Sequence, residues 1–175
     1  MSTDFEGNDY KHFKKNCNVF IETGSELGRG IDAALKAGFD TVYSIELDSK
    51  FHDHCKEKFK DDNRINLILG DSMQELPKLI QNTTHQNFLL WLDAHWSMDG
   101  YAGEMMHDFL PKEMQALLPY KEKLKNAVIM IDDMNHYINN KSFCSTIENL
   151  LKQLKPNSNI EYYHSSNGNI FLVAP

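Results

Sequence analysis

Short apolar runs alternate with longer amphipathic segments along most of this chain, and each of the first five runs ends at or next to an acidic residue. The pattern predicts buried strands at residues 18–22, 41–46, 65–69, 88–93 and 127–132. Helices are expected at residues 30–37, 50–60, 73–81, 111–125 and 142–155, with Pro111 in a first helical turn. Because the strands are apolar on both faces, we predict an α/β protein whose parallel sheet is covered on both sides.

The pattern changes near the end of the chain. Two further apolar runs, at residues 160–164 and 170–173, flank the pair Asn167-Gly168. Asn-Gly between two apolar runs is a strong hairpin signal, so the sheet is expected to end with an antiparallel strand. Right-handed crossovers between the earlier strands favour a doubly wound sheet, although they leave the strand order open.

Length and charge limit the classes of function. The 175 residues suit a single domain, 1–175, and the formal net charge of −7 gives no attraction for nucleic acid or an anionic membrane. No apolar run approaches the roughly 20 residues that cross a bilayer, and residues 1–10 lack the basic start of a secretory signal. We therefore expect a cytoplasmic protein, with Cys17, Cys55 and Cys144 as reduced thiols.

A glycine-rich turn joins the first strand to the first crossover helix. The segment from Glu22 to Gly30 contains three glycines, which allow a ligand to approach the backbone at the start of a helix. It does not fit the dinucleotide pattern GxGxxG, because Glu26 and Arg29 stand where glycines are required counting from Gly24. The alternative is that these glycines only shape a turn.

Acidic residues are also expected near this turn, at the ends of the neighbouring strands. Glu46 ends the second expected strand, Asp71 follows the third, and Asp93 ends the fourth. The carboxyl ends of parallel strands form the ligand-binding edge of open α/β sheets, so a crevice lined by these acids is expected. Glu46, 22 residues after Gly24, is placed to accept from both hydroxyls of a ribose, and Asp71 could accept from an exocyclic amine. Taken singly, each acid could instead cap a helix.

The spacing Glu22-x-Gly24-x-x-x-Gly28-x-Gly30 resembles the loop of class I S-adenosylmethionine-dependent methyltransferases, specifically the catechol and sugar O-methyltransferase-like groups. This resemblance implies a Rossmann-like seven-stranded sheet of order 3-2-1-4-5-7-6. It also implies S-adenosyl-L-methionine as the cofactor, with the methionine part beside Glu22 and Gly24, the ribose at Glu46, and the adenine facing Asp71 and Ser72. The full set of cofactor-binding residues carried over in this way is Glu22, Thr23, Gly24, Gly28, Gly30, Glu46, Leu47, Asp71, Ser72, Asp93 and His95.

Three carboxylates are expected to converge if the fourth and fifth strands are neighbours. Asp93 ends the fourth, and Asp132 and Asp133 end the fifth. Crowded carboxylates favour a hard divalent cation such as Mg²⁺. The resemblance implies the same three residues as metal ligands. The alternative is that Asp132 and Asp133 cap a turn or helix while Asp93 orders the cofactor.

Methyl transfer to oxygen also requires a group that removes a proton. The related catechol enzymes carry a lysine just after the fourth-strand motif, but this chain has no lysine there before Lys112. We predict His95 as the base beside Asp93, with His107, Tyr101 and His136 as weaker choices, because neutral imidazole accepts protons near pH 7. His95 could equally pack against the adenine.

These features predict a cation-assisted O-methyltransferase for a small hydroxylated acceptor, either a sugar or a catechol-like compound. Residues 94–110 are the expected active-site loop, and residues 1–16 an N-terminal substrate or cap segment. Two alternatives stay open: a metal-independent N- or O-methyltransferase, and a non-catalytic nucleotide- or cofactor-binding module. A homo-oligomer is left open too, since small methyltransferases of this type often pair.

Overall fold

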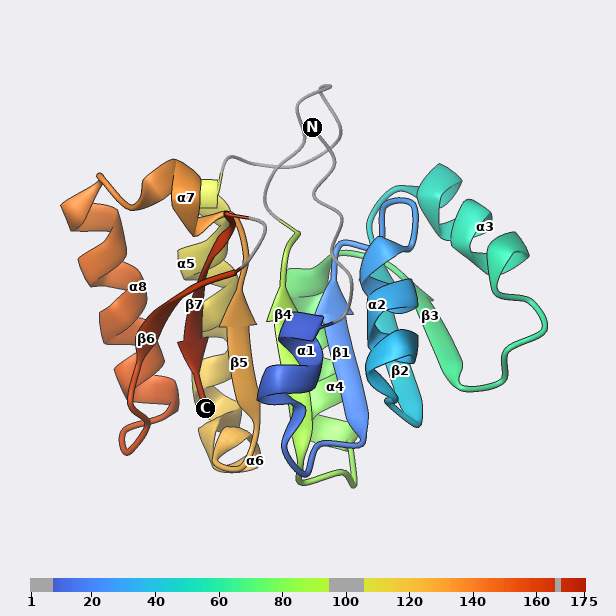
Figure 1. The fold of residues 1–175 in the computed structure, drawn as a ribbon, viewed down its shortest axis with the longest axis horizontal. Helices are drawn as coiled ribbons and strands as arrows, with labels where there is room; N and C mark the ends of the chain where they lie inside the picture. The colour runs from blue at the N-terminus through green and yellow to red at the C-terminus, as the bar shows by residue number, and fades with distance from the viewer. Residues whose placement is uncertain (1–7, 95–105, 166–167) are drawn as a thin grey trace.

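The computed structural model of the chain describes residues 8–94, 106–165 and 168–175. They form a seven-stranded sheet of order β3-β2-β1-β4-β5-β7-β6 (Figure 1). β7 runs antiparallel to β5 and β6, and the other pairs are parallel, so the predicted strand order and antiparallel end are confirmed. The strands are β1 (Val19–Thr23), β2 (Thr41–Glu46), β3 (Ile65–Leu69), β4 (Phe88–Leu92), β5 (Val128–Ile131), β6 (Glu161–His164) and β7 (Ile170–Ala174).

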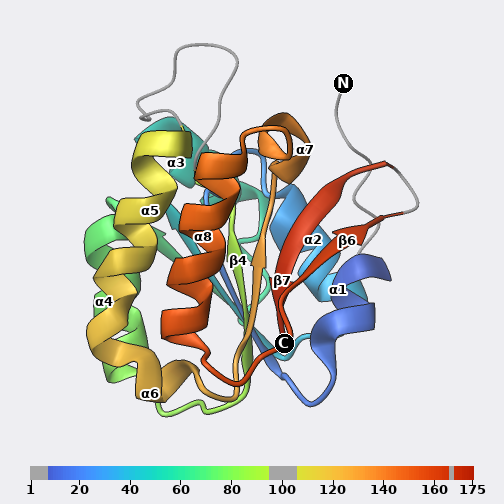
Figure 2. The ribbon, with the colours of Figure 1, turned by 90° about the vertical axis from the view of Figure 1, so that its left-hand side faces the viewer.

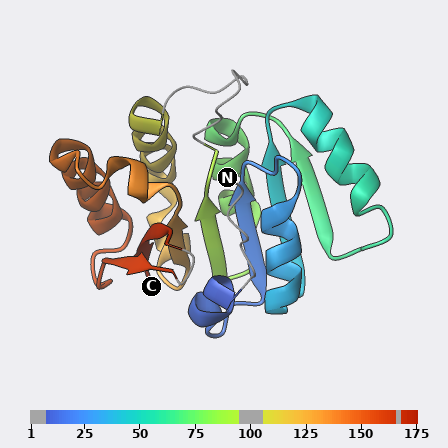
Figure 3. The same cartoon turned by 45° about the horizontal axis from the view of Figure 1, so that its top comes forward.

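Helices cover both faces of this sheet (Figures 2 and 3). One face carries α1 (Asn8–Lys14), α2 (Arg29–Ala37) and α3 (Ser49–Lys58), and the other carries α4 (Ser72–Asn82), α5 (Met106–Leu117) and α8 (Lys141–Leu154). The short elements η1 (Leu118–Tyr120), α6 (Lys121–Leu124) and α7 (Met134–Tyr137) lie in the connections. This arrangement explains why β1, β4 and β5 are buried along their whole length.

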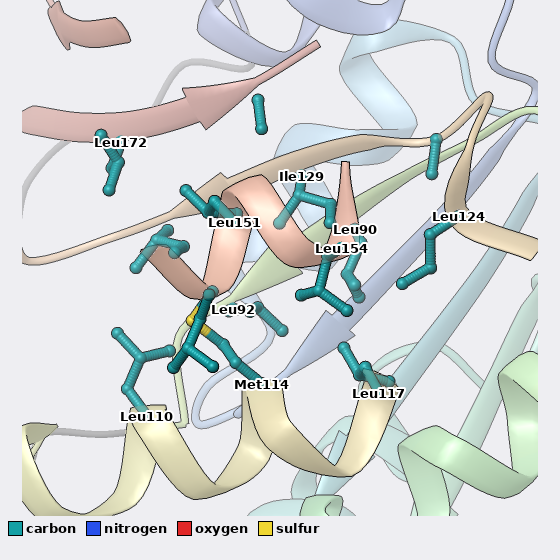
Figure 4. Packing of buried hydrophobic residues seen from close by; sticks show 14 of the residues in the cluster. Leu90, Leu92, Leu110, Met114, Leu117, Leu124, Ile129, Leu151, Leu154 and Leu172 are labelled. Carbon is teal, nitrogen blue, oxygen red and sulfur yellow. The ribbon is translucent and has the colours of Figure 1, made fainter. Parts of the chain in front are cut away.

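Leucine and isoleucine side chains make up most of the core on the α4, α5 and α8 side. Figure 4 shows Leu110, Met114 and Leu117 of α5 packed near Leu90 and Leu92 of β4. These three α5 residues recur at spacings of four and three, which places them on one helix face. Packing therefore fixes α5 against the sheet directly below the carboxyl end of β4.

The expected helix at residues 111–125 is wrong in its limits. The structure has α5 from Met106 to Leu117, then η1 and α6, so residues 106–110 of the expected loop are helical and Pro111 lies inside a helix. Burial of Leu110 together with Met114 outweighs the preference of proline for a first turn. The break near Leu118 coincides with Pro119, which has no N–H to continue the α-helical hydrogen bonds.

Part of the expected N-terminal cap segment belongs to the core. Within residues 1–16, α1 places Tyr10 and Phe13 against the sheet, and both are buried. The Tyr10 ring lies 4.7 Å from that of Phe20 and 5.0 Å from that of Trp91, measured between centroids. Residues 8–14 therefore cover the face of β1 and β4.

The helices and the cysteines bear on the environment in which the chain folds. Among the described residues, the helices are too short or too polar to traverse a bilayer. Cys17, Cys55 and Cys144 are free and buried.

Candidate functional site

The glycine turn lies where β1, β2 and β4 end side by side. Gly24 has a φ of +86°, and its N–H donates to the Ile45 carbonyl at 2.8 Å. A Cβ on Gly24 would lie 2.9 Å from the backbone oxygen of Asp93. The turn therefore requires glycine here both for its left-handed backbone and for the close approach of the β4 end.

Glu22 is buried at the end of β1, with only 1% of its surface exposed. The Ser44 hydroxyl donates to Glu22 Oε1 at 2.6 Å, and Ser44 in turn lies 2.5 Å from the Ser25 hydroxyl. Burial raises the pKa of Glu22 to about 8, more than the Ser44 hydrogen bond lowers it. Burial therefore favours the protonated form of Glu22, which lies beneath the first turn of α2.

Glu46 connects the end of β2 to the glycine turn. Its Oε2 accepts from the backbone N–H of Glu26 at 2.9 Å, and its Oε1 accepts from that of Asp48 at 2.8 Å. The side chain is only 8% exposed, whereas the next residue, Leu47, is 50% exposed. The turn and the β2 acid thus lie together, as the sequence predicts, with an exposed apolar side chain at the rim.

Helix α3 supports the outer side of the turn. Gly28 has a φ of +74°, and a Cβ there would lie 2.6 Å from the Phe59 ring. Lys58 Nζ donates to the Leu27 carbonyl at 2.9 Å and pairs with Asp32 at 2.6 Å. The loop geometry is therefore held by residues that carry no ligand-binding signal in the sequence.

Asp71 and Ser72 begin α4 beside the end of β3. Asp71 Oδ1 accepts from the N–H of Met73 at 2.9 Å, so the helix-cap interpretation is correct for that oxygen. The Ser72 hydroxyl is buried and donates to Glu113 Oε1 at 2.6 Å. Both predicted adenine-facing residues thus lie at the same sheet edge as Glu46, whose carbonyl accepts from Gly70 N at 2.8 Å.

Glu113 on α5 is a site residue that the sequence analysis missed. It is fully buried, and burial raises its pKa to about 7, although the hydrogen bond from Ser72 and the neighbouring Thr23 hydroxyl lower it. A signal was present in the sequence, because Glu113 follows Leu110 by three residues and so shares the buried face of α5. A carboxylate on a buried helix face is uncommon and points to a specific role.

Asp93, Asp132 and Asp133 follow the adjacent strands β4 and β5. The Asp93 N–H donates to Thr23 Oγ1 at 3.3 Å, and its Oδ2 accepts from Trp91 Nε1 at 3.3 Å. Asp132 N donates to the Leu92 carbonyl at 3.2 Å, and Asp132 Oδ1 accepts from Asp133 N at 2.7 Å. Asp133 precedes α7 with a φ of +58°, but its side chain makes no cap hydrogen bond.

These three carboxyl groups disfavour one another's charge. Burial, followed by the charges of Asp132 and Asp133, raises the pKa of Asp93 well above its ordinary value. Burial and Asp133 raise the pKa of Asp132 to about 7. Burial also raises the pKa of Asp133, which His136 opposes. The three predicted acids therefore lie close enough for their charges to oppose one another.

To hold a metal ion, carboxyl groups must be arranged around one point as well as lie near one another. Within residues 8–94, 106–165 and 168–175, no three His, Cys, Asp or Glu side chains are arranged to hold a metal ion. The residue types suit Mg²⁺, which prefers carboxylate oxygens and keeps several waters. His95 and Tyr101 lie outside the described residues, as does most of the expected active-site loop.

The strand order, with its antiparallel seventh strand, is that of the Rossmann-like methyltransferase fold. No protein-family model matches the chain, and no curated protein matches it in sequence.

Solved methyltransferase structures match nearly the whole chain. S-adenosylhomocysteine-bound PaMTH1 of Podospora anserina has a TM-score of 0.67 and 16% identity, covering 98% of this chain and 79% of that one. The O-methyltransferase of Bacillus cereus in complex with S-adenosylhomocysteine gives 0.63 and 18%, with coverages of 99% and 81%. TomG of Streptomyces achromogenes in complex with S-adenosylmethionine gives 0.65 and 12%, with coverages of 98% and 78%. At these identities the likeness establishes the fold.

Proposed function

We propose that this chain is an S-adenosylmethionine-dependent methyltransferase that transfers a methyl group to an oxygen of a small hydroxylated acceptor. The observation that carries the proposal is the position of Glu46, whose two carboxylate oxygens are held by backbone N–H groups against the glycine turn. Open α/β sheets bind nucleotides at this edge. The fold and the cofactor-bound solved structures with the same fold support it.

The residues present fit the proposed cofactor. Each Glu46 oxygen uses one lone pair for the backbone and keeps another for a ribose hydroxyl. Leu47, exposed beside it, offers an apolar surface for adenine, and Asp71 Oδ2 is an acceptor for an exocyclic amine once Oδ1 caps α4. Gly24 has no side chain, so its backbone would be accessible to the methionine part.

The bound cofactor would supply a methyl group on a positively charged sulfur. The protein's own residues then have three tasks: they hold the acceptor oxygen in line with the sulfur–carbon bond, exclude water, and accept the hydroxyl proton. Transfer would form an oxygen–carbon bond, break the sulfur–carbon bond and leave the electron pair of the broken bond on sulfur. We propose His95 as the proton acceptor, with Asp93 two residues before it in the chain.

We further propose that Asp93, Asp132 and Asp133 hold a divalent cation, which would bind two acceptor oxygens and favour the deprotonated one. The support for this is that β4 and β5 end side by side, with Asp132 N donating to the Leu92 carbonyl at 3.2 Å, so that three acids meet whose charges oppose one another. A nearby cation would remove the penalty for these buried like charges. Neighbouring hydroxyls, as in a sugar or a catechol, are the acceptor groups that such a cation selects.

A metal-independent methyltransferase is the second candidate. The observation that favours it is the lack of three suitably arranged metal ligands among the described residues. In that case Asp132 and Asp133 would order the end of β5 through the hydrogen bond between them, and proximity alone would drive the transfer.

Calorimetric titration with S-adenosylmethionine, S-adenosylhomocysteine and NAD tests the main proposal. We expect binding of the first two and none of NAD; tight NAD binding alone would overturn the methyltransferase assignment. Acceptor screening with sugars and phenols, with Mg²⁺ and then with EDTA, separates the two candidates. Full transfer in a metal-free preparation would leave only the metal-independent one.

A further inference from the structure

Glu113 lies between two parts of the proposed cofactor pocket that are distant in the sequence. Its Oε1 accepts from Ser72 at the start of α4. The Thr23 hydroxyl, at the end of β1, also faces the Glu113 carboxyl and lowers its pKa. Thr23 Oγ1 in turn accepts from the backbone N–H of Asp93. One buried carboxyl on α5 therefore connects the ends of β1 and β4 with the first turn of α4.

The Glu113 carboxyl is incompletely satisfied. Its Oε2 is buried and has no hydrogen bond of ordinary geometry among the described residues. A buried polar atom without a partner destabilises a fold by about 1–3 kcal/mol, so a chain optimised for stability alone would carry an apolar residue here. The neighbours Leu110, Met114 and Leu117 on the same helix are apolar and pack in the core. Stability therefore does not account for a glutamate at this position.

We propose that Glu113 is a positioning residue of the cofactor pocket, whose carboxyl fixes the distance between Thr23 beside the methionine end and Ser72 beside the adenine end. This inference rests on the proposed function. The two ends must keep their spacing, because the cofactor spans both while its methyl group has to point at the acceptor. Because α5 packs on β4 through Leu110 and Met114, the backbone that carries Glu113 is held in place relative to the sheet (Figure 4).

The test compares Glu113→Gln and Glu113→Met by calorimetric titration with S-adenosylhomocysteine. The glutamine amide can accept from Ser72 and donate to Thr23, whereas methionine fills similar space and does neither. We expect E113Q to bind within about twofold of the unmodified protein and E113M about tenfold more weakly. E113M removes the unpaired Oε2 but leaves the buried Ser72 hydroxyl without its acceptor, so the melting temperature of each variant is measured and affinities are compared well below that temperature.

The matched control is Glu148→Met on α8, which faces the same side of the sheet. Glu148 accepts from the Tyr162 hydroxyl at 2.8 Å, and Tyr162 belongs to β6, the edge strand that β5 and β7 separate from β4. The Glu148→Met variant should bind S-adenosylhomocysteine with unchanged affinity. If E113M does not fold, Glu113→Leu takes its place.

The outcomes are distinguishable. Wild-type affinity in E113M, or an E113Q variant as weak as E113M, would overturn the positioning role while leaving the proposed function intact. Failure of the unmodified protein to bind either S-adenosylmethionine or S-adenosylhomocysteine would instead overturn the proposed function, and this inference with it.

Discussion

Gly30 lies so close to Glu22 that a Cβ on Gly30 would be 2.0 Å from Glu22 Oε2. This pair joins the end of β1 to the first turn of α2, and the buried acid occupies the space that a side chain on the helix would fill. The absence of a side chain at position 30 is therefore a condition for Glu22 to reach Ser44.

Gly30→Ala is expected to destabilise the protein by about 1–3 kcal/mol, because the new methyl group must displace a buried carboxyl. Thermal unfolding measures the loss. Gly70→Ala is the matched control, since a Cβ there meets the side chain of Glu75, which can move. The effect of Gly30→Ala is also measured in a Glu22→Ala background. If the loss of stability is the same there as in the unmodified protein, the close contact with Glu22 is not the cause.

Glu46→Gln should weaken binding of S-adenosylmethionine about tenfold and lower stability by about 1 kcal/mol. The amide nitrogen of glutamine would face a backbone N–H of Glu26 or Asp48, so one of the two present hydrogen bonds is lost. Calorimetric titration and thermal melting measure the two effects. Glu26→Gln is the control, because its backbone N–H is unchanged; equal effects from both variants would argue against a role for the Glu46 carboxylate.

Asp132→Asn is expected to raise the melting temperature at pH 8 and to abolish any stabilisation by Mg²⁺. Asparagine can still accept from the N–H of Asp133. The substitution removes the negative charge of Asp132, which opposes the ionisation of Asp93. Melting curves with and without Mg²⁺ provide the measurement. Asp61→Asn, on an exposed side chain, serves as the control. A variant that responds to Mg²⁺ as the unmodified protein does would show that Asp132 binds no cation.

The stability of the protein should fall as the pH rises from about 5 to 8. Glu22 and Glu113 have pKa values of about 8 and about 7 in the folded state, both above that of an unfolded glutamate. Between the unfolded and the folded pKa values, the unfolded chain has lost protons that the folded chain keeps. The free energy of unfolding therefore decreases with each unit by which the pH rises. Each kcal/mol lost lowers the melting temperature by about 2–4 °C for a chain of this size.

The pH effect is measured by thermal melting at constant ionic strength in the absence of metal. E113Q should flatten the slope, because glutamine does not titrate. A melting temperature that is constant or rises from pH 5 to 8 would contradict the raised pKa values.

The strand pattern and the positions of the strand-end acids could be predicted from the sequence. Apolar runs that end at Glu46 or Asp93 indicate both a buried strand and the edge where it stops, since burial and charge are properties of the residues themselves. The Asn-Gly signal likewise indicated the antiparallel end. The start of α5 was missed, because a proline at position 111 favours a first turn locally while the packing of Leu110 favours an earlier start.

Sequence alone thus determined which residues reach the carboxyl edge of the sheet, because the order of apolar and acidic residues along each strand fixes where that strand ends. The tertiary structure decided which of them meet. Glu113 comes 41 residues after Ser72, and their hydrogen bond exists only because α4 and α5 pack side by side on one face. Contacts of this kind depend on helix packing and leave no local pattern, so they become visible only in the folded chain.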